Sequence, residues 1–365
     1  MVIPTYNRCR SLERVLAALA CQTVPAGSFE VLVVADGCTD GTVECCRRLA
    51  ATMPYALRLV EQPNGGPATA RNLGVREARA PLIVFVDDDV VPDEELLAAH
   101  LAAHAPDAND NVVAIGPLLP PPDMRLNAWG EWEERTLCKQ YDAMEADLWL
   151  PNYHMFYTGN ASLSRRHILD VGGFDPAFRR AEDIELGNRL SVRGNTFAYL
   201  PHARGWHYVH RSFASWMQMP VAYAGASVMI GRNGRTVDVA RDLSFYVDRN
   251  AAVRLTTWLC LGRPRLVALA TQALHAAAVA GWACRLAPVA NLMCSVIYNL
   301  RYYDSMAAEI GGAKTFWRLV ELAGKHAAAN GKHEDVFAAL EQVLGTKDNA
   351  DENHLGDRLE MEAGV

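Results

Sequence analysis

The chain has 365 residues, which is enough to bury at least one full-sized core and suggests one large domain with an appendage or two modest domains. Half of the residues are hydrophobic and 21% are charged, a composition that is typical of globular proteins and of no single function. The net charge of −7 argues against nucleic acid as a partner, because nucleic-acid-binding domains usually carry a strongly basic surface.

The first 116 residues alternate between strand patterns and helix patterns. A short apolar segment ends at Pro4, residues 11–20 have a helical pattern, and the continuous apolar run at 29–35 is typical of a buried strand. The series continues with helices over 42–53, 68–78 and 93–104 and with strands at 57–61, 81–86 and 112–116. This alternation predicts an α/β fold in which helices cover both faces of a mostly parallel sheet.

The pattern changes after the proline-rich stretch at 117–122, which breaks regular structure. Residues 123–210 have an α+β pattern. Its parts are an aromatic segment at 129–141, a loop at 158–160, a turn at 172–175, a helix at 182–193 and a strand that ends near residue 200. A helical region is predicted over 213–346, and the acidic tail at 347–365 has too few large apolar residues to fold, so we expect it to be disordered.

Polar residues follow three of the predicted strands. Thr5, Tyr6 and Asn7 follow the first strand, Asp36 ends the second, and an acidic triplet follows the strand at 81–86. In open α/β sheets, ligands bind at the carboxyl ends of the strands. The three polar strand ends therefore predict a binding site on one edge of the sheet.

The acidic triplet Asp87-Asp88-Asp89 is the strongest single signal. Like charges repel, and desolvation of carboxylates at the end of a buried strand is costly. A divalent cation would offset this cost, and Mg²⁺ and Mn²⁺ bind carboxylates together with substrate phosphates. The alternative interpretation is a solvated acidic turn that caps the helix near Asp93.

Two further segments are weaker signals by themselves. The carboxylate of Asp36 could accept hydrogen bonds from a base or from ribose hydroxyls, although Asp-Gly is also common in ordinary turns. The glycines at 65–66 lead into a helix whose amides could approach an anion, with Arg71 one turn further on. In the alternative interpretation, the glycines only make a turn and Arg71 pairs with a surface acid.

Taken together, six motifs between residues 4 and 183 indicate a family. They are Pro4-Thr-Tyr-Asn7, Asp36-Gly-Cys-Thr-Asp-Gly41, Gly66-Pro-Ala-Thr-Ala-Arg-Asn72, Asp87-Asp-Asp89, Gly172-Gly-Phe-Asp175 and Glu182-Asp183. In their order and approximate spacing, the chain resembles the inverting family 2 glycosyltransferases with the GT-A fold, over roughly residues 1–210. The resemblance implies a nucleotide-sugar-binding half at 1–116 and an acceptor half at 117–212.

The resemblance also implies a role for individual residues. Asp183 would be the catalytic base, Asp89 would bind Mn²⁺ or Mg²⁺, and His207 would lie near the metal or the diphosphate. The donor, expected to be a UDP-sugar, would be bound by Pro4, Thr5, Tyr6, Asn7, Asp36, Arg71, Asp87 and Asp88. The acceptor side would include Trp149, Gly159, Asn160 and Glu182. One departure is Ala35, where the family often has a second acid. This difference leaves the identity of the donor's nucleobase open.

Asp183 and His207 also have interpretations without a catalytic role. Acids favour helix N-termini because of the helix dipole, which by itself would explain Glu182 and Asp183. A single histidine is more often a packed or surface residue than a ligand, and this applies to His207 and more strongly to His210. The catalytic interpretation of Asp183 is favoured because displacement of a nucleoside diphosphate needs a base for the acceptor proton and a cation for the phosphates.

The function predicted from these residues is transfer of one sugar per encounter to a glycan, a lipid-linked or a small-molecule acceptor, with inversion. A processive synthase is disfavoured because no Gln-x-x-Arg-Trp segment follows Asp183. Two alternatives stay open: a sugar-phosphate nucleotidyltransferase, which could use the same strand-end acids, and an inactive protein that binds nucleotide sugars.

Residues 249–303 differ from the rest of the chain because they contain six arginines and no acidic residue. Basic, apolar helices can lie in a membrane interface and contact anionic headgroups. A helical cap or a homodimer interface is the alternative, and the run at 266–283 is not apolar enough for a convincing span. Unpaired cysteines and the absence of an apolar leader favour a cytoplasmic protein, soluble or peripheral on the inner face of the membrane.

Overall fold

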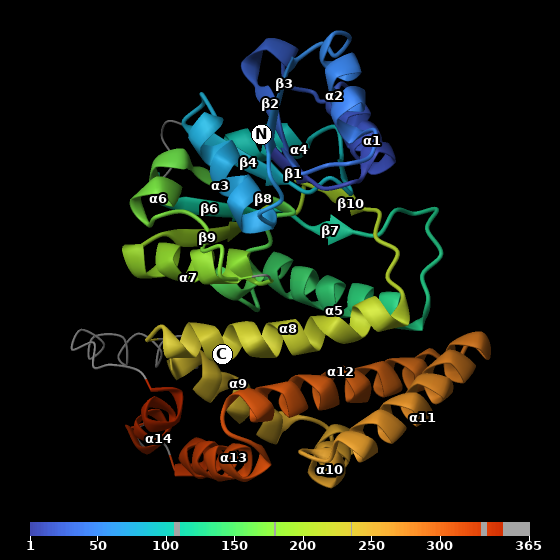
Figure 1. Ribbon diagram of the computed structural model, residues 1–365, viewed down its shortest axis with the longest axis vertical. Helices are drawn as coiled ribbons and strands as arrows, with labels where there is room; N and C mark the ends of the chain where they lie inside the picture. The colour runs from blue at the N-terminus through green and yellow to red at the C-terminus, as the bar shows by residue number, and fades with distance from the viewer. Residues whose placement is uncertain (106–109, 179, 235, 330–333, 346–365) are drawn as a thin grey trace. The chain divides into compact units, whose positions relative to one another are not determined.

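The computed structural model describes residues 1–105, 110–178, 180–234, 236–329 and 334–345 (Figure 1). The acidic tail at 347–365, which was predicted to be disordered, lies outside the described residues. The chain forms two compact units. The first contains residues 1–125 and 134–210, and the second contains residues 126–133 and 211–365.

The first unit is built on a seven-stranded sheet that is mostly parallel. Its strands, in spatial order, are β3 (Ala56–Gln62), β2 (Glu30–Asp36), β1 (Val2–Thr5), β4 (Leu82–Val86), β8 (Asn160–Ser164), β6 (Val112–Ile115) and β9 (Thr196–Tyr199). Strand β8 runs antiparallel to both of its neighbours, and the other pairs are parallel. A smaller sheet has the order β5 (Val90–Pro92), β10 (Gly205–His207) and β7 (Leu118–Leu119).

Helices cover both faces of the large sheet, as the alternation of patterns predicted. One face packs against α1 (Cys9–Leu19), α2 (Thr42–Ala50) and α4 (Leu96–Ala103), and the other against α3 (Pro67–Glu77), α6 (Arg165–Asp170) and α7 (Glu182–Arg193). Within β2, Val31 and Val33 lie in the first of these cores, whereas Leu32 and Val34 point to the opposite face. The continuous apolar run of β2 therefore reflects a strand that is buried on both sides.

Three features differ from the expected local structure. The segment predicted as a loop at 158–160 leads directly into the central strand β8, because Asn160 is its first residue. The aromatic segment forms the long helix α5 (Ala128–Glu145). The short strands β5 and β10 were not predicted; they pair antiparallel, with Val90 opposite His207.

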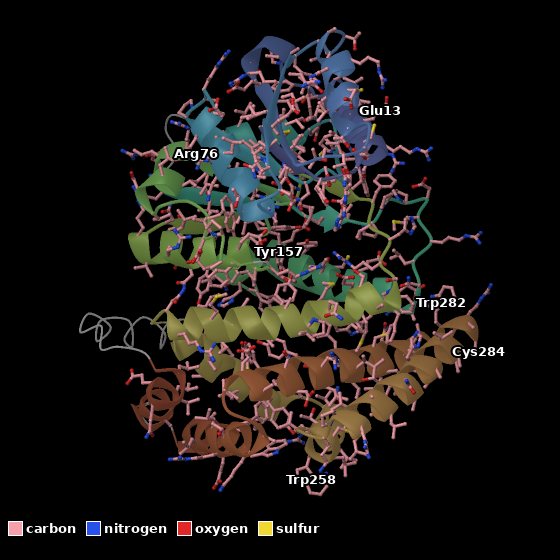
Figure 2. The ribbon with its side chains drawn as sticks, viewed as in Figure 1. Glu13, Arg76, Tyr157, Trp258, Trp282 and Cys284 are labelled. Carbon is pink, nitrogen blue, oxygen red and sulfur yellow. The ribbon has the colours of Figure 1, made fainter. Side chains whose placement is uncertain are left out.

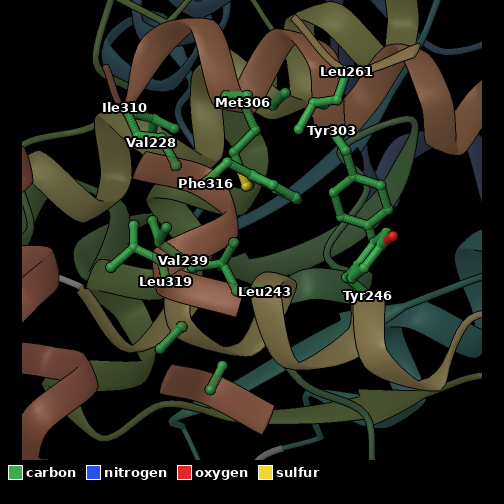
Figure 3. Close-up of a cluster of buried hydrophobic side chains, with 14 of the residues drawn as sticks. Val228, Val239, Leu243, Tyr246, Leu261, Tyr303, Met306, Ile310, Phe316 and Leu319 are labelled. Atoms are coloured by element: carbon green, nitrogen blue, oxygen red, sulfur yellow. The ribbon is translucent and has the colours of Figure 1, made fainter. Parts of the chain in front are cut away.

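The second unit is helical, as predicted. Its helices are α8 (Phe213–Arg232), α9 (Thr236–Asp248), α10 (Ala251–Cys260), α11 (Pro264–Ala283), α12 (Ala287–Glu309), α13 (Ala313–Ala329) and α14 (Glu334–Leu344). Figure 3 shows its largest core, where Tyr246 packs edge-on against Tyr303 and Phe316 among aliphatic side chains from α8, α9 and α13. This unit therefore has a hydrophobic core of its own.

Candidate active site

The carboxyl end of β2 holds Asp36 in a fixed position. Its carboxylate accepts hydrogen bonds from Gln62 Nε2 (2.7 Å), from the Gly65 amide (2.8 Å) and from the Gly66 amide (2.8 Å). Gly66 has a φ of 87°, a left-handed conformation that a side chain would strain. Asp36 thus organises the glycine loop that leads into α3, and its own side chain is only 4% exposed.

The end of β1 is tied to the neighbouring strand ends. The side-chain oxygen of Asn7 accepts hydrogen bonds from the amides of Thr39 (2.7 Å) and Asp40 (3.2 Å). The buried hydroxyl of Thr5 donates to Asp88 Oδ2 at 2.7 Å. Tyr6, in contrast, is 51% exposed, so its ring is free to contact a ligand.

The acidic triplet after β4 is partly neutralised by Arg8, a residue that the sequence analysis did not select. Arg8 Nη1 forms an ion pair with Asp89 and lies 3.4 Å from Asp88 Oδ1. Burial raises the pKa of Asp88 to about 7. Burial acts in the same direction on Asp89, but its hydrogen bond to His207 and the charges of His207 and Arg8 lower the pKa of Asp89 to about 2.

Asp87 pairs with a different arginine from the other two acids of the triplet. Arg71, which is 5% exposed, donates from Nη2 to Asp87 Oδ1 and from Nη1 to Glu182 Oε1, both at 2.7 Å. A partly buried ion-pair chain therefore connects the end of β4, helix α3 and the start of α7. Arg71 was expected near the donor and Glu182 on the acceptor side, and the structure joins these two side chains directly.

Asp183 lies at the start of α7, next to this chain. Burial, followed by the negative charge of Glu182, raises the pKa of Asp183 to about 7. The Thr158 amide lies 3.4 Å from its Oδ2. Ala181, just before α7, has a φ of 56°, an unfavourable conformation for a residue with a side chain. Strained backbone of this kind gathers at functional sites, where the surrounding structure maintains it.

Asn160 is fully buried, and its side chain is occupied by the protein. Its Nδ2 donates to the carbonyl oxygens of Pro117 (3.0 Å) and Ala203 (2.6 Å), which leaves Oδ1 to accept from His100 Nε2 at 2.9 Å. The other nitrogen of His100 then accepts from the hydroxyl of Ser162, 2.8 Å away. Burial lowers the pKa of His100 to about 4, which keeps the imidazole neutral. We therefore assign Asn160 a role in holding the sheet, in place of the expected acceptor contact.

The other residues expected on the acceptor side lie in more open positions or next to the triplet. Trp149 is 43% exposed on the segment after α5. At Gly159, a Cβ would come within 3.1 Å of Asp87 Oδ2, so the missing side chain lets the backbone approach the triplet. Burial, together with the charge of Asp183, raises the pKa of the Tyr157 hydroxyl to about 12.

The side chains around Asp89 have the chemistry of a divalent-cation site that a ligand completes. Among the described residues, no group of three or more His, Cys, Asp or Glu side chains is placed to hold a metal ion. His207 Nε2 lies 3.5 Å from Asp89 Oδ1, and Asp88 shares Arg8 with Asp89. Mg²⁺ and Mn²⁺ usually take one or two protein carboxylates and complete their shell with substrate phosphates. The residues fit such an ion if Arg8 moves aside.

Comparisons with known proteins agree with this geometry. The sequence profile of glycosyl transferase family 2 matches residues 1–172. The validoxylamine A glucosyltransferase of Streptomyces hygroscopicus subsp. jinggangensis is 35% identical over 218 residues, which cover 53% of this chain and 51% of that protein. The match thus spans about half the length of this relative and of the same enzyme from Streptomyces hygroscopicus subsp. limoneus.

Two solved structures share the fold. A mannosyltransferase from Pyrobaculum calidifontis, in complex with GDP-Man and Mn²⁺, matches with a TM-score of 0.50 at 20% identity, covering 94% of this chain and 83% of that one. Residues 1–349 of TarS from S. aureus, in complex with UDP-GlcNAc, match with a TM-score of 0.51 at 16% identity, covering 85% and 91%. The fold is therefore GT-A, and residues 1–172 of the chain are similar to glycosyl transferase family 2.

Proposed function

We propose that the protein is an inverting, metal-dependent glycosyltransferase that moves one sugar per encounter from a UDP-sugar to an acceptor hydroxyl. The observation that carries the proposal is the position of Asp183. It is a half-buried residue whose carboxyl has a pKa near neutrality, and its neighbour Glu182 is joined through Arg71 to the acidic triplet. A base that titrates near the working pH is suited to proton abstraction. The complexes of TarS with UDP-GlcNAc and of the mannosyltransferase with GDP-Man support a nucleotide-sugar donor.

The reaction needs one proton transfer and one displacement. The carboxylate of Asp183 takes the proton of the acceptor hydroxyl, and the acceptor oxygen forms a bond to the anomeric carbon. The bond between that carbon and the diphosphate oxygen breaks, and its electron pair leaves with the nucleoside diphosphate. Attack from the side opposite to the leaving group inverts the anomeric centre.

The acidic triplet and Arg8 serve the leaving group. A divalent cation held by Asp89 and His207 would neutralise the charge that develops on the diphosphate. Arg8 directly precedes α1, and its side chain is 49% exposed. The guanidinium can therefore turn from Asp89 to the diphosphate. The exposed ring of Tyr6 and the loop ordered by Asp36 would form the nucleoside side of the site.

A panel of nucleotide sugars, measured by thermal shift with Mn²⁺ and with EDTA, tests this proposal. A ligand that binds only the folded protein raises its melting temperature, so the true donor should stabilise the chain in the presence of the metal. The same mixtures, with candidate acceptors, should release nucleoside diphosphate. Binding without release would favour an inactive binding protein, and release of pyrophosphate from a nucleoside triphosphate would favour a nucleotidyltransferase; either result would contradict the proposal.

A further inference from the structure

The helical unit exposes a group of large apolar side chains on two consecutive helices. Six of them, Leu255, Trp258, Leu259, Leu266, Leu269 and Val279, are between 41% and 63% exposed, and we refer to these six as the apolar face. Figure 2 shows Trp258 on α10, at the outer side of the unit. Single exposed apolar residues are normal, whereas a group on adjacent helices marks an interaction surface.

The outward side of α11 shows how unusual this surface is. Residues 265, 269, 272, 276, 279 and 283, spaced by three or four, are all exposed. A helix on a protein surface normally turns charged residues toward water. On this side of α11, between Leu266 and Ala283, Gln272 is the one polar side chain that is exposed and no residue carries a formal charge. The solvent-facing side of α11 is therefore as apolar as a core-facing side.

The inward side of α11 belongs to the core of the unit. Val267 packs with Cys260 and Leu300, and Ala278 lies in the core that contains Trp216. At Gly281, a Cβ would come within 3.2 Å of the Ala290 amide, so α11 and α12 approach closely. By length and composition, α11 is the one helix among the described residues that could cross a membrane, with a mean hydropathy of 1.4. Its packing indicates a helix that lies along a surface, because a span would have to leave this core.

Exposed arginines flank the apolar face. Arg254 lies on α10, Arg263 and Arg265 lie at the start of α11, and Arg285 follows its end. In the described part of the chain, none of these four guanidinium groups forms an ion pair with a carboxylate. Residues 249–303 contain no Asp or Glu that could pair with these arginines, although the net charge of the protein is −7. The carboxylate of Asp304 accepts from the Gly262 amide, beside Arg263.

We infer that the apolar face and its four arginines form a docking surface for an anionic membrane. The outward side chains of α10 and α11 would enter the boundary between headgroups and acyl chains, and the arginines would contact lipid phosphates. Tryptophan suits this position because it is amphipathic and favours membrane interfaces. The choice of a membrane over a second protein rests on charge: one sign of charge around an apolar centre matches an anionic bilayer.

Co-sedimentation of the full chain with vesicles tests the inference. Vesicles of phosphatidylcholine with about one third phosphatidylglycerol should bind the chain, and pure phosphatidylcholine vesicles should bind it far less. The double variant Trp258→Ser, Leu269→Ser should lose at least about tenfold in vesicle affinity, because it removes buried apolar surface from the complex. Each of the substitutions Arg263→Gln and Arg265→Gln should cost about fivefold, and added salt should weaken binding.

Matched control variants are available in the first unit. Leu169→Ser removes a leucine that is 43% exposed, and Arg47→Gln removes an exposed arginine; both variants should bind vesicles as the wild type does. The inference would be overturned if the double variant bound vesicles as tightly as the wild type. It would also be overturned if the wild type bound equally well with and without phosphatidylglycerol. A wild-type dimer that the double variant converts to monomer while neither binds vesicles would overturn it as well, because the apolar face would then bind a second copy. None of these readouts depends on sugar transfer.

Discussion

The ion-pair chain through Arg71 gives the sharpest prediction for stability. The Arg71→Met substitution keeps an unbranched side chain and removes the guanidinium that contacts Asp87 and Glu182 at 2.7 Å each. Loss of one partner from a buried pair typically costs about 3–5 kcal/mol, because the remaining charge is left in a poorly solvated place. The side chain of Glu182 is 10% exposed, but that of Asp87 is 34% exposed and can be hydrated. We therefore expect a loss near the lower limit, about 3 kcal/mol.

Thermal unfolding at pH 7.5 measures this loss. For a unit of this size, about 3 kcal/mol corresponds to a decrease in melting temperature of about 6–12 °C. The control is Arg47→Met, because the ion pair between Arg47 and Glu61 is 61% and 50% exposed in its two side chains. An exposed pair contributes at most about 1 kcal/mol. A loss for Arg71→Met no larger than that of the control would refute the proposed energetics of the chain.

Three other changes test the site. Glu182→Gln removes a negative charge that helps to raise the pKa of Asp183. The rise of kcat/KM with pH, which we place near pH 7, should therefore move to lower pH. An unmoved pH profile would argue against Asp183 as the titrating base. Asp89→Ala should abolish Mn²⁺-dependent donor binding in calorimetry, and unchanged binding would mean that the metal lies elsewhere. Asn160→Ala removes the partner of His100 Nε2 and of the Ala203 carbonyl oxygen, whereas the Pro117 carbonyl oxygen keeps its hydrogen bond from the Gly205 amide. Two unsatisfied groups should cost about 3 kcal/mol in denaturant unfolding, and a loss below about 1 kcal/mol would show that water replaces the amide.

Much of the first unit could be predicted from local patterns. The predicted strand at 29–35 is observed as Glu30–Asp36, and the predicted helix at 182–193 has the same bounds in the structure. Both segments have a strong local signal, a continuous apolar run in the first and helical spacing with acidic residues at the N-terminus in the second. The order of the polar strand ends also followed from the alternation, because parallel strands place their carboxyl ends together.

Strand β8 could not be predicted in this way. Its sequence contains Asn160 and Ser162, which read as loop residues, yet both are fully buried in the centre of the sheet. They are stabilised there by hydrogen bonds to His100 and His104, about 60 positions earlier in the chain. A polar residue in a central strand is stable only if such partners exist, and a local pattern does not show them.

The charged contacts of the site show the same limit. Charge alone indicated that the acidic triplet needs a cation, but the sequence did not show that Arg8 lies beside Asp88 and Asp89. Its position directly after Asn7 in the first motif was the available signal, because strands β1 and β4 are neighbours and end on the same edge. The link from Arg71 to Glu182 spans 111 positions and depends on the tertiary fold.

The Asp183→Asn substitution tests the central claim most directly. It keeps the shape of the side chain and removes the carboxylate that would accept the acceptor proton. With the donor found in the nucleotide-sugar panel, we predict an unchanged Kd in calorimetry and a decrease of about 10²- to 10⁴-fold in the rate of sugar transfer. Transfer at a rate close to that of the wild type would contradict Asp183 as the catalytic base and with it the proposed mechanism.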